Sequence, residues 1–294
     1  MINKKFSTGI LIIFFFIPCL FAYRIQYAQT LIFSNQIGSF TSAKSFSINS
    51  AGYIFVSDSS LNEIIKLDTL GNVVKTIGGY GWNDSSFDNP TDVFATTLNV
   101  YISDKNNNRI QIFNKDLDYI SQFSTQNSSD SRYIFAYPTC SGLSTQGDLF
   151  ILDSDNKRIL KFNARNEFQT EIGGFDAGSY SLSNPLNFTI SSSGKLIVVD
   201  PPLLVMFDQF GNGIRKIKLN LSPSNINSVF QIITVNNKNQ VSIFSSIELE
   251  TGNINPMVLS PGNEDEILDS FVFHKNLYIL TKNSISIYKI IEAR

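Results

Sequence analysis

Four aspartate residues that each end an apolar run recur at nearly constant spacing along this chain. They follow the runs "YIFVS", "NVYIS", "LFIL" and "LIVV" and are Asp58, Asp104, Asp153 and Asp200, at intervals of 46, 49 and 47 residues. A proline or small residue precedes each aspartate by 14 or 15 positions, at Ala43, Pro90, Pro138 and Pro185. A sequence pattern that recurs at a fixed interval, with constant spacing around one residue, indicates a repeat architecture.

The repeat length and its internal pattern predict an all-β fold. One repeat reads as four short runs rich in β-branched and aromatic residues: residues 91–97, "NVYISD", "NRIQIFN" and "DYISQF". No stretch with helical periodicity competes with these runs. Four antiparallel strands in about 46 residues correspond to one blade of a β-propeller.

The chain length predicts six blades, with five as the alternative. Without its first 28 residues the chain has 266 residues, which is just under six repeats. A fifth blade is predicted from "VFQIITVNN", "QVSIFSSIE" and "INPMVLS", with Ser246 at the aspartate position and one outer strand lost or irregular. A sixth blade ends after three strands, with Thr281 or Lys282 at that position. We expect residues 30–38 to pair with "SISIYKI" and close the ring, which would remove two exposed edges.

The repeats resemble those of a known family. "YISDKNNNRIQIF" and "FILDSDNKRILKF" are similar to the blades of exported bacterial-type NHL-repeat proteins, which are six-bladed β-propellers. The pattern departs at Asp58, where Glu63 replaces the expected arginine, and at Asp200, where "PPLL" removes both asparagine and arginine. The resemblance covers residues 37–219 well. It implies the fold strongly and the function weakly, since propellers host many activities.

The first 28 residues have the layout of a secretory signal. Lys4 and Lys5 precede an apolar core at residues 10–21, and Ala22 or Ala28 could mark a cleavage site. An uncleaved N-terminal anchor is the alternative. Residues 29–294 then form a single propeller domain, with repeats at 37–76, 77–123, 124–171, 172–219, 220–260 and 261–294 plus 30–38. A cleaved signal predicts a periplasmic, cell-surface or secreted protein.

Composition excludes several kinds of chemistry. A net charge of −2 with 16% charged residues provides no basic surface for nucleic acid. Cys140 is the only cysteine outside the expected signal, so no internal disulfide is predicted, and a buried inert thiol is favoured. The single histidine, His274, is expected on an inner strand in a structural role.

The repeated aspartates are interpreted as structural. Four copies at equivalent positions cannot all belong to one catalytic centre. A carboxylate at a strand end can accept hydrogen bonds from turn amides and fix the entry of the next strand. We therefore expect Asp58, Asp104, Asp153 and Asp200 to lock the turns of their blades.

Recognition is expected at residues that do not repeat. Long Gly- or Ser-rich connections at residues 78–89, 125–137 and 173–184 carry the candidates Tyr80, Trp82, Arg132, Tyr133, Phe175 and Tyr180. Loops on a rigid scaffold commonly bind partners. The alternative is that these aromatic side chains wedge between blades. The favoured hypothesis is a monomeric, non-catalytic binding or scaffolding module for a protein or glycan, without a cofactor.

An enzyme is the alternative hypothesis. Calcium-dependent lactonase-like propellers place oxygen ligands around the central tunnel, and Asp92 and Asn187 each follow the start of an inner strand. Ser45 and either Cys140 or Ser141 hold the equivalent places in other repeats, so the ligand set is incomplete. A hydrolase or lyase with calcium at the tunnel would use these residues. An envelope-anchored sensor is a third possibility.

Overall fold

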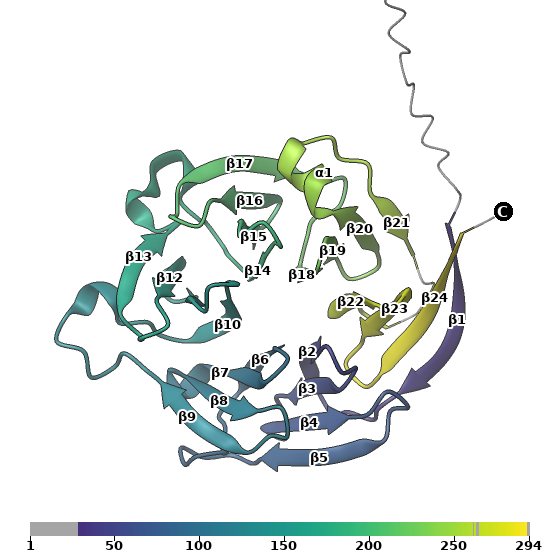
Figure 1. Cartoon of the computed structure of the whole chain (residues 1–294), viewed down its shortest axis with the longest axis horizontal. Coiled ribbons are helices and arrows are strands. Elements are labelled where there is room, and N and C mark those ends of the chain that lie inside the picture. Colours follow the sequence, from purple (N-terminus) through teal and green to yellow (C-terminus); the bar gives the residue numbers. More distant parts are fainter. Residues whose placement is uncertain (1–28, 261, 263–264, 293–294) are drawn as a thin grey trace, which may run out of the picture.

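Six sheets surround a central axis in the computed structural model, which describes residues 29–260, 262 and 265–292. Each sheet contains four antiparallel strands, and the sheets follow one another around a ring (Figure 1). The protein is therefore a six-bladed β-propeller, as the repeat length predicts. The five-bladed alternative is wrong.

In the first five blades the strands run outward from the axis in chain order. The first three blades are β2 (Ala43–Ile48), β3 (Ile54–Asp58), β4 (Glu63–Leu67) and β5 (Val73–Gly78); β6 (Pro90–Ala95), β7 (Asn99–Asp104), β8 (Arg109–Asn114) and β9 (Tyr119–Phe123); and β10 (Pro138–Leu143), β11 (Leu149–Asp153), β12 (Arg158–Phe162) and β13 (Phe168–Ile172). The fourth and fifth are β14 (Asn187–Ile190), β15 (Leu196–Asp200), β16 (Leu203–Phe207) and β17 (Gly213–Lys218); and β18 (Asn225–Val229), β19 (Ile232–Asn236), β20 (Val241–Ser245) and β21 (Met257–Leu259).

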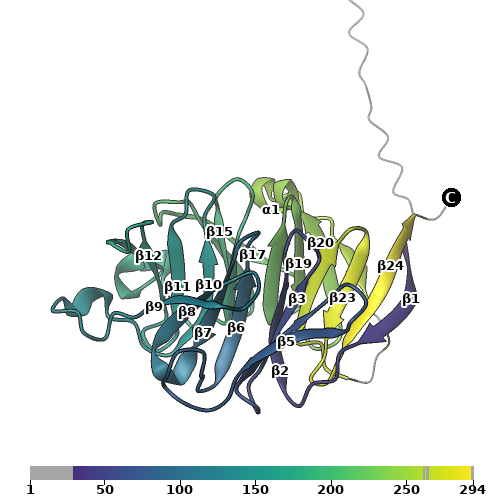
Figure 2. The same cartoon turned by 60° about the horizontal axis from the view of Figure 1, so that its bottom comes forward.

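The sixth blade is completed by the N-terminal strand. It contains β22 (Asp269–Phe273), β23 (Asn276–Leu280) and β24 (Ile285–Glu292), and β1 (Gln29–Ile37) pairs antiparallel with β24. Leu31 lies opposite Ile290 and Ile37 opposite Ile285, so both ends of the described chain lie side by side (Figure 2). The predicted ring closure is confirmed. The expected signal or anchor, residues 1–28, lies outside the described residues.

The fifth blade differs from the prediction. Its second strand ends at Asn236, so Asn236 and not Ser246 holds the position of the periodic aspartate. The run "VFQIITVNN" contains the turn between β18 and β19, where Phe230 has a φ of 53°, and no glycine or asparagine marks that turn. The outer strand β21 is present but has only three residues, and the helix α1 (Ser246–Thr251) precedes it.

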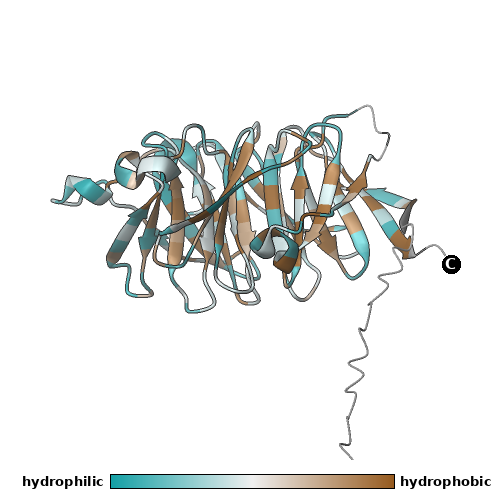
Figure 3. Cartoon of the chain, turned by 90° about the horizontal axis from the view of Figure 1, so that it is seen from above, coloured by the Kyte–Doolittle hydropathy of each residue, from teal (hydrophilic) through white to brown (hydrophobic). Residues whose placement is uncertain are grey.

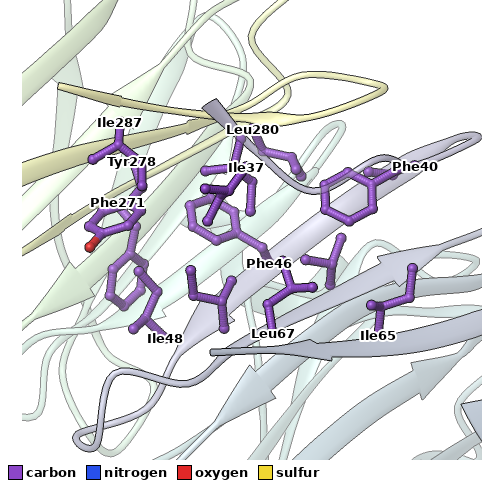
Figure 4. Close-up of a cluster of buried hydrophobic side chains, with 14 residues drawn as sticks. Ile37, Phe40, Phe46, Ile48, Ile65, Leu67, Phe271, Tyr278, Leu280 and Ile287 are labelled. Atoms are coloured by element: carbon purple, nitrogen blue, oxygen red, sulfur yellow. The ribbon is translucent and has the colours of Figure 1, made fainter. Parts of the chain in front are cut away.

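The core lies between neighbouring blades. Apolar side chains face each other across each boundary, as at the last and first blades, where the Phe46 and Phe271 rings lie 5.9 Å apart (Figure 4). Most hydrophobic residues lie in the strands, whereas the turns at both ends of the strands are mostly hydrophilic (Figure 3). Burial falls in the outer strands, and β5 alternates between exposed and half-buried positions. This packing fixes the six inner strands around the axis.

Candidate functional site

Each periodic aspartate binds the connection that enters its own blade. Asp104 is buried and accepts hydrogen bonds from the Asp88 backbone N–H at 2.8 Å and from Arg109 Nε at 2.7 Å. Asp153 is buried too and accepts from the Ala136 N–H at 3.1 Å and from Arg158 Nε at 2.9 Å. The carboxylate thus joins the entering connection to the third strand.

The two copies without an arginine partner use more backbone donors. Asp58 accepts from the N–H groups of Thr41 at 2.6 Å and Ser42 at 3.1 Å. Asp200 accepts at 3.0 Å from the N–H of Ser183 and also from that of Asn184. All four aspartates therefore occupy the same structural place, with donors that a turn lock requires.

The first long connection carries an exposed aromatic pair. The rings of Tyr80 and Trp82 lie 5.9 Å apart, edge to face, and their side chains are 66% and 70% exposed. Arg109 donates from Nη1 to the Trp82 carbonyl at 2.8 Å and from Nη2 to the Ser86 carbonyl at 2.9 Å. The pair therefore sits on a backbone that a buried arginine holds in place.

The other predicted recognition residues divide into two groups. Arg132 is exposed and donates from Nε to Asp130 at 2.9 Å, and Phe175 is 95% exposed. Tyr133 stacks on Phe168 with 5.1 Å between ring centroids, and Tyr180 packs 6.1 Å from Phe207. Tyr133 and Tyr180 therefore pack against the body of the propeller.

The second and third connections meet at a groove, and the aromatic pair of the first connection does not line it. The groove has a volume of about 490 Å³ and is lined by charged residues of both signs, among them Arg132, Arg158, Glu171 and Asp176.

Two buried carboxyl groups lie on the inner strands. Ser45 Oγ donates to Asp92 Oδ1 at 2.7 Å, and the Ser141 N–H donates to Asp92 Oδ2 at 3.3 Å. The Phe46 N–H donates to Asp269 Oδ2 at 3.2 Å, and the Asn227 amide donates to Asp269 Oδ1. Asp92 therefore joins the first, second and third blades, whereas Asp269 joins the fifth, sixth and first.

Amide side chains complete the circle through the remaining blades. Cys140 Sγ donates to Asn187 Oδ1 at 2.9 Å, and Asn187 Nδ2 donates to Asn225 Oδ1. Asn225 Nδ2 donates to the Leu268 carbonyl at 3.2 Å. Side-chain hydrogen bonds therefore link each inner strand to the next around the whole axis. We call these contacts the axial circle.

The electrostatics of the axial circle are dominated by burial. Burial, together with the negative charge of Asp92, raises the pKa of Asp269 to about 8. Burial likewise raises the pKa of Asp92, and it raises the pKa of the Cys140 thiol well above its usual value. Cys140 is thus a buried neutral donor, which agrees with the inert thiol expected from the sequence.

A cavity of about 510 Å³ extends from the axial circle to one face of the propeller. It begins at Asp92, Ser141 and Asn187 and follows the inner strands to the turns that lead into the second strands. Its walls are mainly apolar, and they include Phe94, Leu143, Phe188, Ile190, Val229 and Phe271. We call the face on which it opens the cavity face. The three long connections lie on the opposite face, together with the turns after the periodic aspartates.

His274 lies at the mouth of this cavity. The sequence predicted it on an inner strand, but it occupies the turn after β22, is exposed and has a φ of 47°. Its ring stacks on Phe273 with 4.1 Å between centroids. Phe230, which is 80% exposed, lies at the same mouth.

Sequence reasoning missed Asn225, Asn227 and Asp269. A signal was present, because members of the axial circle precede the end of the second strand of their blade by a nearly constant offset. This offset is 13 residues for Ser45, 12 for Asp92 and 11 for Asp269. The wrong register in the fifth blade hid the equivalent Asn225.

The candidate calcium ligands Asp92 and Asn187 both line the cavity. Asn187 Oδ1 accepts from Cys140 and from the Phe188 N–H at 2.6 Å. Calcium takes six to eight oxygen ligands. Within residues 29–260, 262 and 265–292, no group of three or more His, Cys, Asp or Glu side chains is placed to hold a metal ion.

Comparisons with known proteins agree with the fold. No protein-family model matches the sequence. Protein brain tumor from Drosophila melanogaster, an NHL protein, is 28% identical over 144 residues, which span 47% of this chain and 13% of that protein. The match thus covers a small part of that relative.

Solved structures share the architecture at low sequence identity. Virginiamycin B lyase from Staphylococcus aureus covers 90% of this chain and all of its own, with a TM-score of 0.60 and 12% identity. A streptogramin B lyase structure covers 90% of this chain and 98% of its own, with a TM-score of 0.62 and 12% identity. A chain of a nidogen/laminin complex covers 75% and 81%, with a TM-score of 0.57 and 14% identity. These likenesses establish the fold alone.

None of the helices in the described part of the chain has the length and apolar character needed to cross a membrane.

Proposed function

We propose that this protein is an exported NHL-type propeller that binds an envelope or extracellular partner, a protein or a glycan, without catalysing a reaction. The observation that carries the proposal is the exposed Tyr80–Trp82 pair on a connection held by Arg109. Large aromatic side chains contribute much of the binding energy at interfaces, and they stack on sugar rings and pack against apolar groups.

The connection is organised before any partner arrives. Arg109 is buried, pairs with Asp104 at 2.7 Å and donates to the carbonyls of Trp82, Asn83 and Ser86. Binding therefore does not have to order this segment, which removes part of the entropic penalty of association.

Two comparisons support a binding role. One structural neighbour comes from a nidogen/laminin complex, so a propeller of this fold takes part in a protein assembly. The relative of 28% identity is an NHL protein, in agreement with the motifs at Asp104 and Asp153. Export rests on the signal-like pattern of residues 1–28.

The test uses Trp82 as its own reporter, because it is the only tryptophan of the chain. Purified protein is titrated with isolated cell-envelope glycans and envelope proteins, and Trp82 emission and bound fraction are recorded. We expect a blue shift on binding, and we expect Trp82→Ala and Tyr80→Ala to weaken binding at least about tenfold. Phe210→Ala, which removes an exposed aromatic side chain elsewhere, is the matched control. Equal binding by Trp82→Ala and the wild type would refute the proposal.

A lyase- or lactonase-like enzyme is the second candidate, favoured by the axial cavity with Asp92 and Asn187 in its lining. It predicts that calcium raises the melting temperature, that Asp92→Ala and Asn187→Ala abolish this shift, and that the protein turns over esters or lactones. A metal-dependent shift with turnover would favour the enzyme over the binding module.

A further inference from the structure

The axial cavity has an acidic group at its inner end and no cation beside it. Among the described residues that line the cavity, Asp92 is the only acidic one, and His274, at the opposite end, is the only basic one. Ser45 Oγ and the Ser141 N–H donate to Asp92, and the Cys140 thiol and the Val93 N–H also interact with it. All four groups are uncharged. A buried carboxylate normally has a cationic partner, because removing it from water is costly.

A second group at the inner end lacks a partner. Ser141 is 3% exposed and lines the cavity, and its hydroxyl has no hydrogen-bond partner within the described chain. Buried hydroxyl groups are nearly always hydrogen-bonded. A hydroxyl is both a donor and an acceptor. The inner end therefore holds an unused donor and acceptor beside the acidic group of Asp92.

The rest of the cavity suits an apolar body. Phe94, Leu143, Ile190 and Val229 lie between the inner end and the mouth, and Phe230 and Phe273 are at the mouth. The volume of about 510 Å³ falls within the range of small-molecule sites.

We propose that this cavity binds a small organic ammonium ligand, with the ammonium group at Asp92 and Ser141 and an apolar body against the walls. An ammonium supplies three donors and one positive charge, which the inner end lacks. The carboxylate of Asp92 would repel an anionic group. A calcium ion would need several further oxygens, and Asn187 Oδ1 is occupied by Cys140 and Phe188. The site opens on the cavity face, so it is independent of the Tyr80–Trp82 pair.

The first experiment is a charge series on the full chain at pH 7 by isothermal titration calorimetry. The probes are 2-phenylethylamine, the neutral 2-phenylethanol, the anionic 3-phenylpropionate and calcium chloride. We expect the amine to bind at least about tenfold more tightly than the alcohol, because a hydrogen bond to a charged group is worth more than a neutral one. We expect no binding of the anion. Equal affinity for amine and alcohol, or binding of calcium but not of the amine, would overturn the proposal.

Three variants locate the site. Asp92→Asn keeps the shape and should abolish the preference for the amine, whereas the exposed Asp155→Asn on the opposite face should leave it unchanged. Ser141→Ala removes a hydroxyl that has no partner, so the protein should be at least as stable and should bind the amine about threefold or more weakly. Ser141→Ala therefore tests whether the amine binds at this site even if Asp92→Asn does not fold. Unchanged amine binding in Ser141→Ala and in any folded Asp92→Asn protein would overturn the proposal.

Discussion

The hydroxyl of Ser45 donates to Asp92 Oδ1 at 2.7 Å across the boundary between the first and second blades. The two residues are 47 positions apart and occupy similar places on successive inner strands, β2 and β6. Around the axis this place holds serine, aspartate, cysteine or asparagine. A mixture is required, because six identical carboxylates would repel one another, whereas donors and acceptors in alternation can form a closed circle.

Removal of a periodic carboxylate should destabilise the fold. Asp104→Ala leaves the Asp88 N–H and the buried Arg109 side chain without their acceptor, so we expect a loss of about 3 kcal/mol in the free energy of unfolding. Urea denaturation measures this loss. The exposed Asp155→Asn is the control and should change stability by less than about 0.5 kcal/mol. A similarly small change for Asp104→Ala would rule out the turn-lock interpretation.

Deletion of the N-terminal strand should open the ring. Without β1, strand β24 loses its partners from Gln29 to Ile37 and presents an unpaired edge, which favours aggregation. We expect a lower melting temperature or loss of the monomer peak in size-exclusion chromatography with light scattering. Replacement of exposed Phe33 by Thr is the control, because it retains the backbone ladder. A stable monomer after the deletion would contradict this role of β1.

Stability should fall as pH rises between about 4 and 8. The usual pKa of an aspartate is 3.8, whereas burial raises that of Asp269 to about 8, so the folded state binds the extra proton within this window. The slope from this single group is at most about 1.4 kcal/mol per pH unit. The raised pKa of Asp92 acts in the same direction, and the lowered pKa of Asp130 acts below the window.

Asp269→Asn should flatten this dependence, because the amide stays neutral at every pH. Urea denaturation from pH 5 to 8 compares the variant with the wild type. A wild-type stability that rises with pH over this range, or an equal slope in the variant, would contradict the prediction.

A cleaved signal predicts a new N-terminus. If residues 1–28 direct export and are removed, mass spectrometry of the exported protein should find the chain beginning between Tyr23 and Thr30. Recovery of intact Met1 from the membrane fraction would instead support the uncleaved anchor.

The propeller itself follows from local sequence. Alternating β-branched and aromatic runs, their phase relative to the aspartates and the length of the chain predict four-stranded blades, six of them, and closure by the N-terminal strand. The blades can be predicted from the sequence because consecutive strands pair within each blade, and only β1 pairs with a strand distant in sequence, β24. The fifth blade was misread because Phe230, at positive φ, forms a turn without a sequence signal, and α1 interrupts the period.

The axial site depended on tertiary structure. Ser45 and Asp92 meet only because the ring brings successive repeats into contact, and Asp269 reaches the first blade only because the ring closes. The same geometry places the cavity on one face of the propeller and the Tyr80–Trp82 pair on the other. The cavity opens where the inner strands end, whereas the long connections lead into the starts of these strands. Tyr133 and Tyr180 pack inward while Trp82 faces solvent, although all three lie in similar polar connections. The sequence by itself determined the strands of each blade. Only the closed ring decided which side chains share a site, because the contacts that form the site join residues from different blades.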